Sequence, residues 1–180
     1  SKFVHIKATP HIVLPIYNFH TELEPFILPE SSNQSKKYRL FLAKYKKHMF
    51  YDTANVLVSE WISGGDLLDF LRSKGHTLTL LQWKVIMFQI IFTLAIIQKT
   101  YPTFRHNDLK ANNILVEVHP KKDTSYAYQY NDRVWNVPDQ GIHTRLWDFD
   151  FATIPGVVDN QKVMSAFTDA VNVDPTPNRY

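Results

Sequence analysis

Four polar side chains in two segments of the chain could together carry acid–base and metal chemistry. Asp108, Lys110 and Asn113 lie in one polar run, and Asp148 lies further along the chain. A carboxylate can accept the proton of a hydroxyl group, and an ammonium group can stabilise negative charge that develops during a reaction. An amide oxygen and a second carboxylate are suitable ligands for Mg²⁺. Together these groups meet the needs of phosphoryl transfer, which depends on an oriented hydroxyl, bound metal ions and nearby positive charge.

Each of these residues also has an ordinary structural explanation. Asp108 and Asn113 could form turns, because Asp and Asn side chains bond to nearby backbone groups. Lys110 could be a solvated lysine. The order of the residues favours the chemical interpretation, because residues 106–113 read HNDLKANN and fit the pattern H-x-D-L-x-x-x-N. Downstream, residues 148–150 read Asp-Phe-Asp and resemble D-F-G with its glycine replaced.

On these motifs the chain resembles the eukaryotic-type protein kinase superfamily, and it is similar to serine/threonine-protein kinases of large DNA viruses. The resemblance implies that Asp108 is the catalytic base and that Lys110 contacts the transferred phosphate. It implies that Asn113 and Asp148 hold Mg²⁺, and that His106 packs the catalytic loop against the metal-binding segment. The implied cofactors are ATP and Mg²⁺, and the implied partner is a protein substrate with a Ser or Thr hydroxyl.

The segment before the catalytic loop resembles the strand, hinge and first C-lobe helix of a kinase domain. By that resemblance Ser59 is the gatekeeper, and backbone groups of Glu60 and Ile62 bind adenine. Asp66 then lies near the ribose, and Leu115 forms the floor under the adenine ring. Independently of the resemblance, Asp66 opens a helix, since an acidic residue suits the positive end of a helix dipole.

Hydrophobic periodicity and turn residues predict the elements that position these side chains. Apolar or β-branched runs predict strands, and apolar residues at spacings of three and four predict helices. The expected strands are 11–19, 55–62, 113–118 and 145–149, and the expected helices are 36–50, 66–74 and 79–100. Pro15 interrupts the first strand and indicates an edge or a bulge. Residues 20–35 and 119–143 are expected to be loops.

The resemblance implies an α+β fold, the two-lobed protein-kinase-like fold in incomplete form, with a partial antiparallel N-lobe sheet and a mainly helical C-lobe. Residues 1–62 are expected to form the partial N-lobe, with an insertion at 20–53. Residues 63–180 are expected to hold the hinge, the catalytic loop, an insertion at 119–143 and the start of the activation segment. ATP is expected in the cleft between the lobes.

The chain departs from the kinase pattern at several points. Asn107 stands where the family has Arg, which argues against control by a phosphorylated activation loop. Asp150 replaces the glycine of D-F-G and should reduce backbone flexibility there. The sequence shows no G-x-G-x-x-G loop, no V-A-I-K lysine and no A-P-E segment. We therefore expect a fragment, a split gene or a degenerate copy, with negligible phosphotransfer by these 180 residues alone.

The sequence leaves two other functions open. A small-molecule kinase of the choline or aminoglycoside type shares His-Asn-Asp in the loop and often an acidic residue after Asp-Phe, as in 148–150. Lys110 and the hinge at 63–67 favour a protein kinase instead. A pseudokinase binding module would explain the missing phosphate loop, whereas the retained polar residues argue against it. Nucleic-acid binding by the basic run 36–47 is not favoured, because it matches no known module.

Composition sets further limits on the function. The chain has a net charge of +3. It has no Cys, and the absence of Cys excludes disulfides and thiolate metal sites and favours a reducing compartment. We expect an intracellular protein, in the host cytoplasm or the virion if it is viral. No membrane span is expected, because Gln82, Lys84 and Gln89 interrupt the most apolar stretch. The histidines other than His106 lack helical metal-ligand spacing and are assigned no role.

Overall fold

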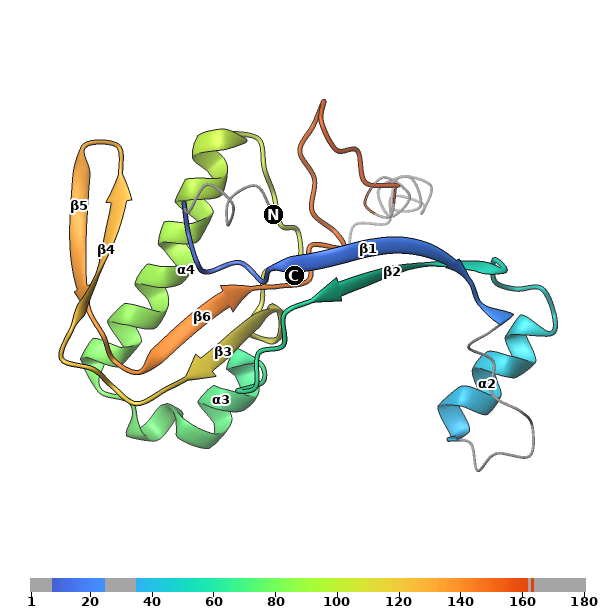
Figure 1. The fold of residues 1–180 in the computed structure, drawn as a ribbon, viewed down its shortest axis with the longest axis horizontal. Helices are drawn as coiled ribbons and strands as arrows, with labels where there is room; N and C mark the ends of the chain where they lie inside the picture. Colours follow the sequence, from blue (N-terminus) through green and yellow to red (C-terminus); the bar gives the residue numbers. More distant parts are fainter. Residues whose placement is uncertain (1–7, 25–34, 162, 164–180) are drawn as a thin grey trace, which may run out of the picture. The chain divides into compact units, whose positions relative to one another are not determined.

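The computed structural model describes residues 8–24, 35–161 and 163 (Figure 1). The chain divides into two compact units. One unit is Leu14–Glu60, and the other combines the chain up to Val13 with the chain from Trp61 onward. Each unit has its own strands and helices and is described by itself.

The unit Leu14–Glu60 is a pair of strands with a helix in the connection between them. Its elements are β1 (Pro15–Glu22), α2 (Lys36–Tyr45) and β2 (Thr53–Ser59). The strands pair antiparallel, and their register shifts between Pro15 and Tyr17, where the proline cannot donate a ladder hydrogen bond. The Ser35 hydroxyl caps α2 by accepting from the Tyr38 N–H at 3.2 Å.

The elements of this unit differ from the sequence prediction mainly at their ends. The strand expected at 11–19 begins at Pro15, so the proline starts the strand rather than interrupting it. The helix expected at 36–50 ends at Tyr45, because a turn follows in which His48 has a left-handed φ of 54°. Part of the loop expected at 20–35 lies outside the described residues.

The second unit places a long helix beside short antiparallel strand pairs (Figure 1). Its elements are α3 (Leu67–Lys74), α4 (Leu80–Thr100), β3 (Ile114–Val118), β4 (Ser125–Tyr130), β5 (Arg133–Pro138) and β6 (Ile142–Leu146), with 3₁₀ turns at Gly75–Thr77 and Ala111–Asn113. β3 pairs with β6, and β4 pairs with β5. Asp66 caps α3 and Thr79 caps α4, as the sequence indicated, and Thr79 forms a capping box with Gln82.

The segment 119–143 was expected to be a loop, and this prediction was wrong. It contains the β4–β5 hairpin, and β6 begins at Ile142 rather than at residue 145. The strand pattern was hard to see because its inward positions are tyrosines, of which Tyr128 is buried, and because β5 is largely exposed. Asn131 in the hairpin turn has a φ of 52°, the left-handed conformation that such two-residue turns require.

The main core of this unit lies between α4 and the β3–β6 sheet. Ile86, Ile90 and Ile97 of α4 pack in one cluster with Val116 of β3 and Leu146 of β6, and each is at most 8% exposed. Burial of an aliphatic side chain contributes roughly 1.5–3 kcal/mol, so this cluster holds the helix firmly on the sheet. The loop that leaves the end of α4 therefore starts from a fixed point.

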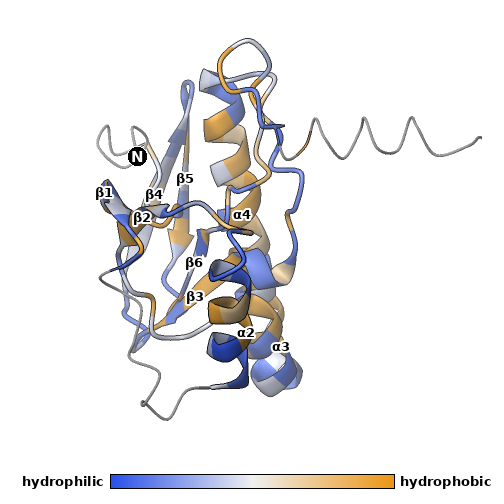
Figure 2. Cartoon of the chain, turned by 90° about the vertical axis from the view of Figure 1, so that its right-hand side faces the viewer, coloured by the Kyte–Doolittle hydropathy of each residue, from blue (hydrophilic) through white to orange (hydrophobic). Residues whose placement is uncertain are grey.

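α4 is long and apolar enough to cross a membrane by length and composition, so our expectation that no segment passes this test was wrong. Figure 2 shows its mainly hydrophobic colouring. Its polar Gln89 is 1% exposed and is satisfied inside the fold. The Gln89 amide donates to the Ile142 carbonyl at 3.0 Å and accepts from the Thr144 N–H at 2.8 Å. Gln89 thus joins α4 to β6, as is typical of a core helix.

An aromatic cluster joins the β4–β5 hairpin to α4 and to the chain's start. The Tyr128 ring lies edge-on to Phe88 and Phe92, with centroids 5.0 Å from each. Its hydroxyl donates to His11 Nε2 at 2.8 Å, because His11 Nδ1 donates to the Thr144 carbonyl at 2.7 Å. Burial lowers the pKa of His11 to about 4 and raises the pKa of Tyr128 to about 12.

Candidate active site

The polar run singled out in the sequence forms a tight turn between α4 and β3. The chain passes through buried Phe104 and then the polar residues before the 3₁₀ turn Ala111–Asn113. The Asn113 N–H donates to the Lys110 carbonyl at 2.9 Å, which closes this turn. Because β3 is held in the core, the turn is fixed at its far end as well.

The turn brings Asp108, Lys110 and Asn113 into direct contact. Lys110 Nζ donates to both carboxylate oxygens of Asp108, at 2.9 and 2.7 Å. Asn113 Nδ2 donates to the Asp108 carbonyl at 2.9 Å and to its Oδ2 at 2.8 Å. The Asp108 carboxylate is therefore fixed in position while its side chain stays 28% exposed to solvent.

The surroundings of Asp108 favour its ionised form. The hydrogen bond from the Lys110 ammonium is the main reason that the pKa of Asp108 lies below its ordinary value. Partial burial opposes this shift, and the hydrogen bond from Asn113 supports it. A carboxylate with a lowered pKa holds a proton poorly, so it is suited to orienting a hydroxyl by accepting its hydrogen bond.

His106 links this turn to the Asp-Phe-Asp segment, as expected from the sequence. It is 5% exposed, and its Nε2 donates to the Trp147 carbonyl at 3.2 Å. Its ring lies against Phe149, with centroids 5.0 Å apart. The Trp147 N–H also donates to the Asn113 carbonyl at 3.0 Å. Both ends of the polar turn are therefore attached to the residue that precedes Asp148.

Asp148 has a left-handed backbone, with a φ of 58°. Asp tolerates this conformation better than most residues, and such strained positions cluster at functional sites. Its Oδ1 accepts from the Asp150 N–H at 3.4 Å. The Asp that replaces glycine at position 150 is thus part of a local turn in which the Asp148 side chain contacts its own segment.

Asn113 and Asp148 offer oxygen ligands of the kind that Mg²⁺ prefers. The nitrogen of the Asn113 amide is used on Asp108, so its oxygen is the atom that can bind a cation. Asp148 follows a residue that is hydrogen-bonded to Asn113. These donors are of the type that suits Mg²⁺.

Asn107 has a role that sequence reasoning did not assign. Its Nδ2 donates to the Phe151 carbonyl at 2.9 Å and to Thr153 Oγ1 at 3.0 Å. Next to it, Arg105 and Thr153 exchange two backbone hydrogen bonds, at 3.0 and 2.9 Å. Asn107 itself has a φ of 62°. The only sequence signal was its position in place of the family's arginine, which does not reveal a bond to a residue far along the chain.

Of the expected nucleotide-binding residues, the structure brings Asp66 and Leu115 together. They form an isolated antiparallel bridge, and the Asn112 amide donates to Asp66 Oδ2 at 3.4 Å. Ile62 is buried in the same unit. Ser59 ends β2 in the other unit.

Glu60 also belongs to that unit, where it bonds to the start of β1. Its N–H donates to the Leu14 carbonyl at 3.0 Å, and its Oε1 accepts from the Leu14 N–H at 2.8 Å. The expected adenine-binding residues are therefore divided between the two units.

Comparison with known proteins identifies the family. A family model described as protein tyrosine and serine/threonine kinase matches residues 28–149, which include the whole polar turn and Phe149. The chain belongs to this kinase family. The family assignment confirms the sequence resemblance, and the described elements agree with an incomplete α+β kinase-like fold.

Named relatives come from a virus and an amoeba. "Putative serine/threonine-protein kinase R400" of Acanthamoeba polyphaga mimivirus is 44% identical over 190 residues, which cover 100% of this kinase-family chain and 41% of the relative. "Putative serine/threonine-protein kinase R301" of the same virus is 46% identical over 71 residues, or 38% of this chain and 18% of the relative. A "Probable serine/threonine-protein kinase" of Dictyostelium discoideum is 34% identical over 73 residues, or 41% of this chain and 6% of the relative.

Proposed function

We propose that this chain carries the catalytic turn and the metal-binding segment of a protein serine/threonine kinase, which transfers the γ-phosphate of ATP to a Ser or Thr hydroxyl. The observation that supports this most directly is the Asp108 carboxylate held by Lys110 and Asn113. Membership of the kinase family and the names of the mimivirus relatives support the same reaction.

Each residue of the turn has a separate role in this proposal. Asp108 accepts the hydrogen bond of the substrate hydroxyl and takes its proton as the oxygen attacks. Lys110 stabilises the negative charge of the transferred phosphate, since its side chain is 54% exposed and can reach a ligand. Asn113 and Asp148 hold Mg²⁺, which, when bound, neutralises phosphate charge and orients the γ-phosphate.

In this proposal the residues implied by the kinase resemblance bind the nucleotide. Backbone groups of Glu60 and Ile62 bind adenine, with Ser59 as gatekeeper. Asp66 lies at the ribose, and Leu115 lies under the adenine ring. The bridge between Asp66 and Leu115 supports a shared role for these two residues. Residues 1–62 then serve as the N-lobe portion and 63–180 as the C-lobe portion.

The test is γ-phosphate transfer to hydroxylated peptides by the intact gene product that contains this chain. We expect Asp108→Asn to lower kcat by roughly 10²–10⁴-fold, because the hydroxyl loses its base. We expect Asp148→Asn to lower the rate and raise the Mg²⁺ concentration that gives half-maximal activity. Asp132→Asn, in the exposed turn between β4 and β5, is the matched control and should leave kcat unchanged.

Full phosphotransfer by the Asp108→Asn variant would contradict the proposal. A folded wild-type product that transfers phosphate to choline or aminoglycosides, but not to any Ser or Thr peptide, would contradict the substrate class. Circular dichroism of each variant checks that a loss of rate does not come from unfolding.

A further inference from the structure

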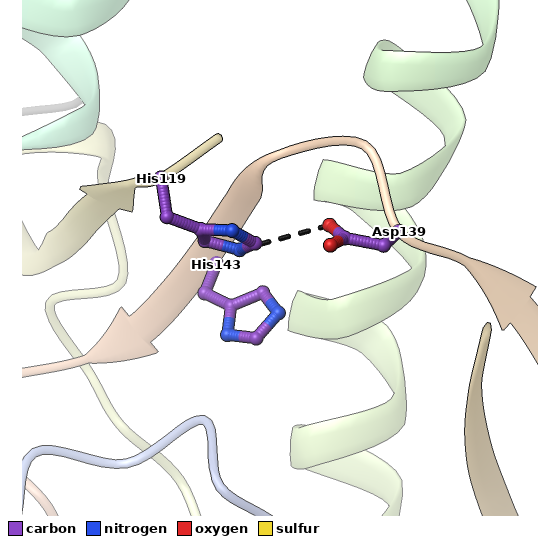
Figure 3. Close-up of side chains that lie close together, drawn as sticks. All are labelled: His119, Asp139 and His143. Atoms are coloured by element: carbon purple, nitrogen blue, oxygen red, sulfur yellow. Dashed lines mark ion pairs between the residues drawn. The ribbon is translucent and has the colours of Figure 1, made fainter. Parts of the chain in front are cut away.

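Three metal-ligating side chains meet at the base of the β4–β5 hairpin, away from the polar turn in sequence. His119 directly follows β3, Asp139 directly follows β5, and His143 lies in β6. One ligand atom from each residue lies within 4.8 Å of the others. Figure 3 shows the two imidazole rings close together, with the Asp139 carboxylate facing His119. Sequence reasoning assigned these histidines no role because their ligand spacing is neither local nor helical.

His119 carries the first part of the argument, because its hydrogen bonding fixes which ring nitrogen holds the proton. Nδ1 lies 3.0 Å from the Pro120 carbonyl, which can only accept, so Nδ1 is the donor. In the neutral ring Nε2 then has a free electron pair. This Nε2 is buried, lies 3.6 Å from Asp139 Oδ1, and has no hydrogen-bond partner among the described residues.

Asp139 presents a fixed negative charge to that nitrogen. It is 2% exposed, and its Oδ1 accepts from the Gly141 N–H at 2.7 Å while its Oδ2 accepts from the Lys122 N–H at 3.1 Å. These two backbone N–H donors favour the charged form of the buried carboxylate. Each carboxylate oxygen keeps a second lone pair for a metal.

His143 supplies a further nitrogen without a partner. Its Nε2 is buried and has no hydrogen bond within the part of the chain that the structure describes. Its ring lies edge-on to His119, with centroids 4.8 Å apart, and edge-on to Tyr126 at the same distance. Buried imidazole nitrogens without partners are costly. Each of the two histidines in this cluster has one, and the cluster also holds a buried carboxylate, which is the setting in which a bound cation would be favourable.

We infer that His119, Asp139 and His143 bind a zinc ion. Zn²⁺ takes His nitrogens and carboxylate oxygens at about 2.0–2.2 Å in tetrahedral geometry, which places ligand atoms roughly 3.3–3.6 Å apart. The 3.6 Å between His119 Nε2 and Asp139 Oδ1 lies at this spacing. Mg²⁺ prefers oxygen ligands throughout, so two imidazoles select against it. A water molecule would complete the four ligands.

Two cavities adjoin this cluster. His143 and Tyr126 line a cavity of about 780 Å³, and His119 lines another of about 770 Å³ with Gly141. The bound ion would join the end of β3, the loop before β6 and β6 itself. Its role would be structural, because it would hold the base of the β4–β5 hairpin on the β3–β6 sheet.

The experiment is zinc binding by the untagged chain after dialysis against a chelator. We expect one Zn²⁺ per chain by elemental analysis, and a rise in Tm on the order of 5 °C when zinc is restored. His119→Gln should weaken zinc binding by at least about tenfold and remove most of the Tm rise. His76→Gln, which changes an exposed histidine beyond α3, is the matched control and should bind zinc like the wild type.

Failure of the wild-type chain to bind zinc, or equal zinc affinity in His119→Gln, would overturn the inference. In that case His119 and Asp139 form a simple ion pair, and a chelator would leave Tm unchanged in every variant. Visible absorption of the Co²⁺-loaded wild-type chain tests the tetrahedral geometry without any substitution. None of these measurements depends on ATP or phosphotransfer, so their outcome is independent of the proposed kinase reaction.

Discussion

At the scale of single residues, the site depends on how tightly Asp108 is held. Two donors from Lys110 and Asn113 fix a carboxylate that is still open to solvent, and the lysine keeps the pKa of that carboxyl low. The sequence motif was enough to single out these residues as the candidate site. Their mutual hydrogen bonds could not be predicted from the sequence, because they depend on the geometry of the 3₁₀ turn that follows.

Asn107 allows a test of the contact between the polar turn and the segment after Asp148. Asn107→Ala loses the hydrogen bonds to Phe151 and Thr153 and also forces Ala into a left-handed φ. We expect a loss of about 2–3 kcal/mol in the free energy of unfolding, measured with urea.

Asn107→Gly separates the two causes, because glycine accepts the left-handed φ but supplies no side-chain donor. It should lose about half as much stability as the alanine variant. Both variants should show faster amide hydrogen exchange at residues 151–153. Unchanged exchange there in both variants would contradict this account of Asn107.

At the scale of elements, the close approach of the segment before α3 to β3 depends on a glycine. A Cβ at Gly64 would lie 2.0 Å from the Val116 carbonyl oxygen, which is backbone and cannot move easily. The neighbouring Gly65 carbonyl accepts from the Val116 N–H at 2.9 Å, so the two segments are in direct contact. We expect Gly64→Ala to cost about 1–3 kcal/mol of stability in urea unfolding.

Gly75 provides the matched control for this substitution. It has an ordinary helical φ of −55°, and a Cβ there would meet side-chain atoms no closer than 3.8 Å. Gly75→Ala should therefore be neutral or stabilising by up to about 1 kcal/mol. Equal destabilisation by both substitutions would show that Gly64 has no special packing role.

The elements also show where sequence reasoning succeeded and where it did not. α4 and β3 were predicted closely, because a long apolar period and a clear cap at Thr79 define them locally. The β4–β5 hairpin was missed, because its inward residues are tyrosines whose burial depends on packing against α4. The cluster of His119, Asp139 and His143 was missed for a similar reason, since strand pairing rather than spacing brings it together.

At the scale of the whole molecule, one buried network joins distant parts of the chain. His11 contacts Thr144 of β6 and Tyr128 of β4, and the charges of His143 and Arg145 also act on it. Burial lowers the pKa of His11 from 6.5 to about 4, so the unfolded chain binds a proton that the folded chain does not between these pH values. Stability should therefore fall as pH decreases from about 6.5 to about 4.

For His11 this loss in the free energy of unfolding should reach about 3 kcal/mol. It can be measured by urea unfolding at several pH values in the presence of a chelator. His11→Gln should be less stable at neutral pH but should lose much less on acidification. His20→Gln, in exposed β1, should follow the wild-type pH dependence. Parallel pH curves for the wild type and His11→Gln would contradict the role of His11.

The central claim is that Asp148 and the Asp108 turn act on one Mg²⁺-bound nucleotide. The most direct measurement is the affinity of the intact product for a non-hydrolysable ATP analogue, with and without Mg²⁺, by calorimetry. The account predicts that Asp148→Asn reduces the increase in affinity caused by Mg²⁺ by about tenfold or more, while Asp108→Asn keeps that increase. A full Mg²⁺-dependent increase in affinity in Asp148→Asn would contradict the account.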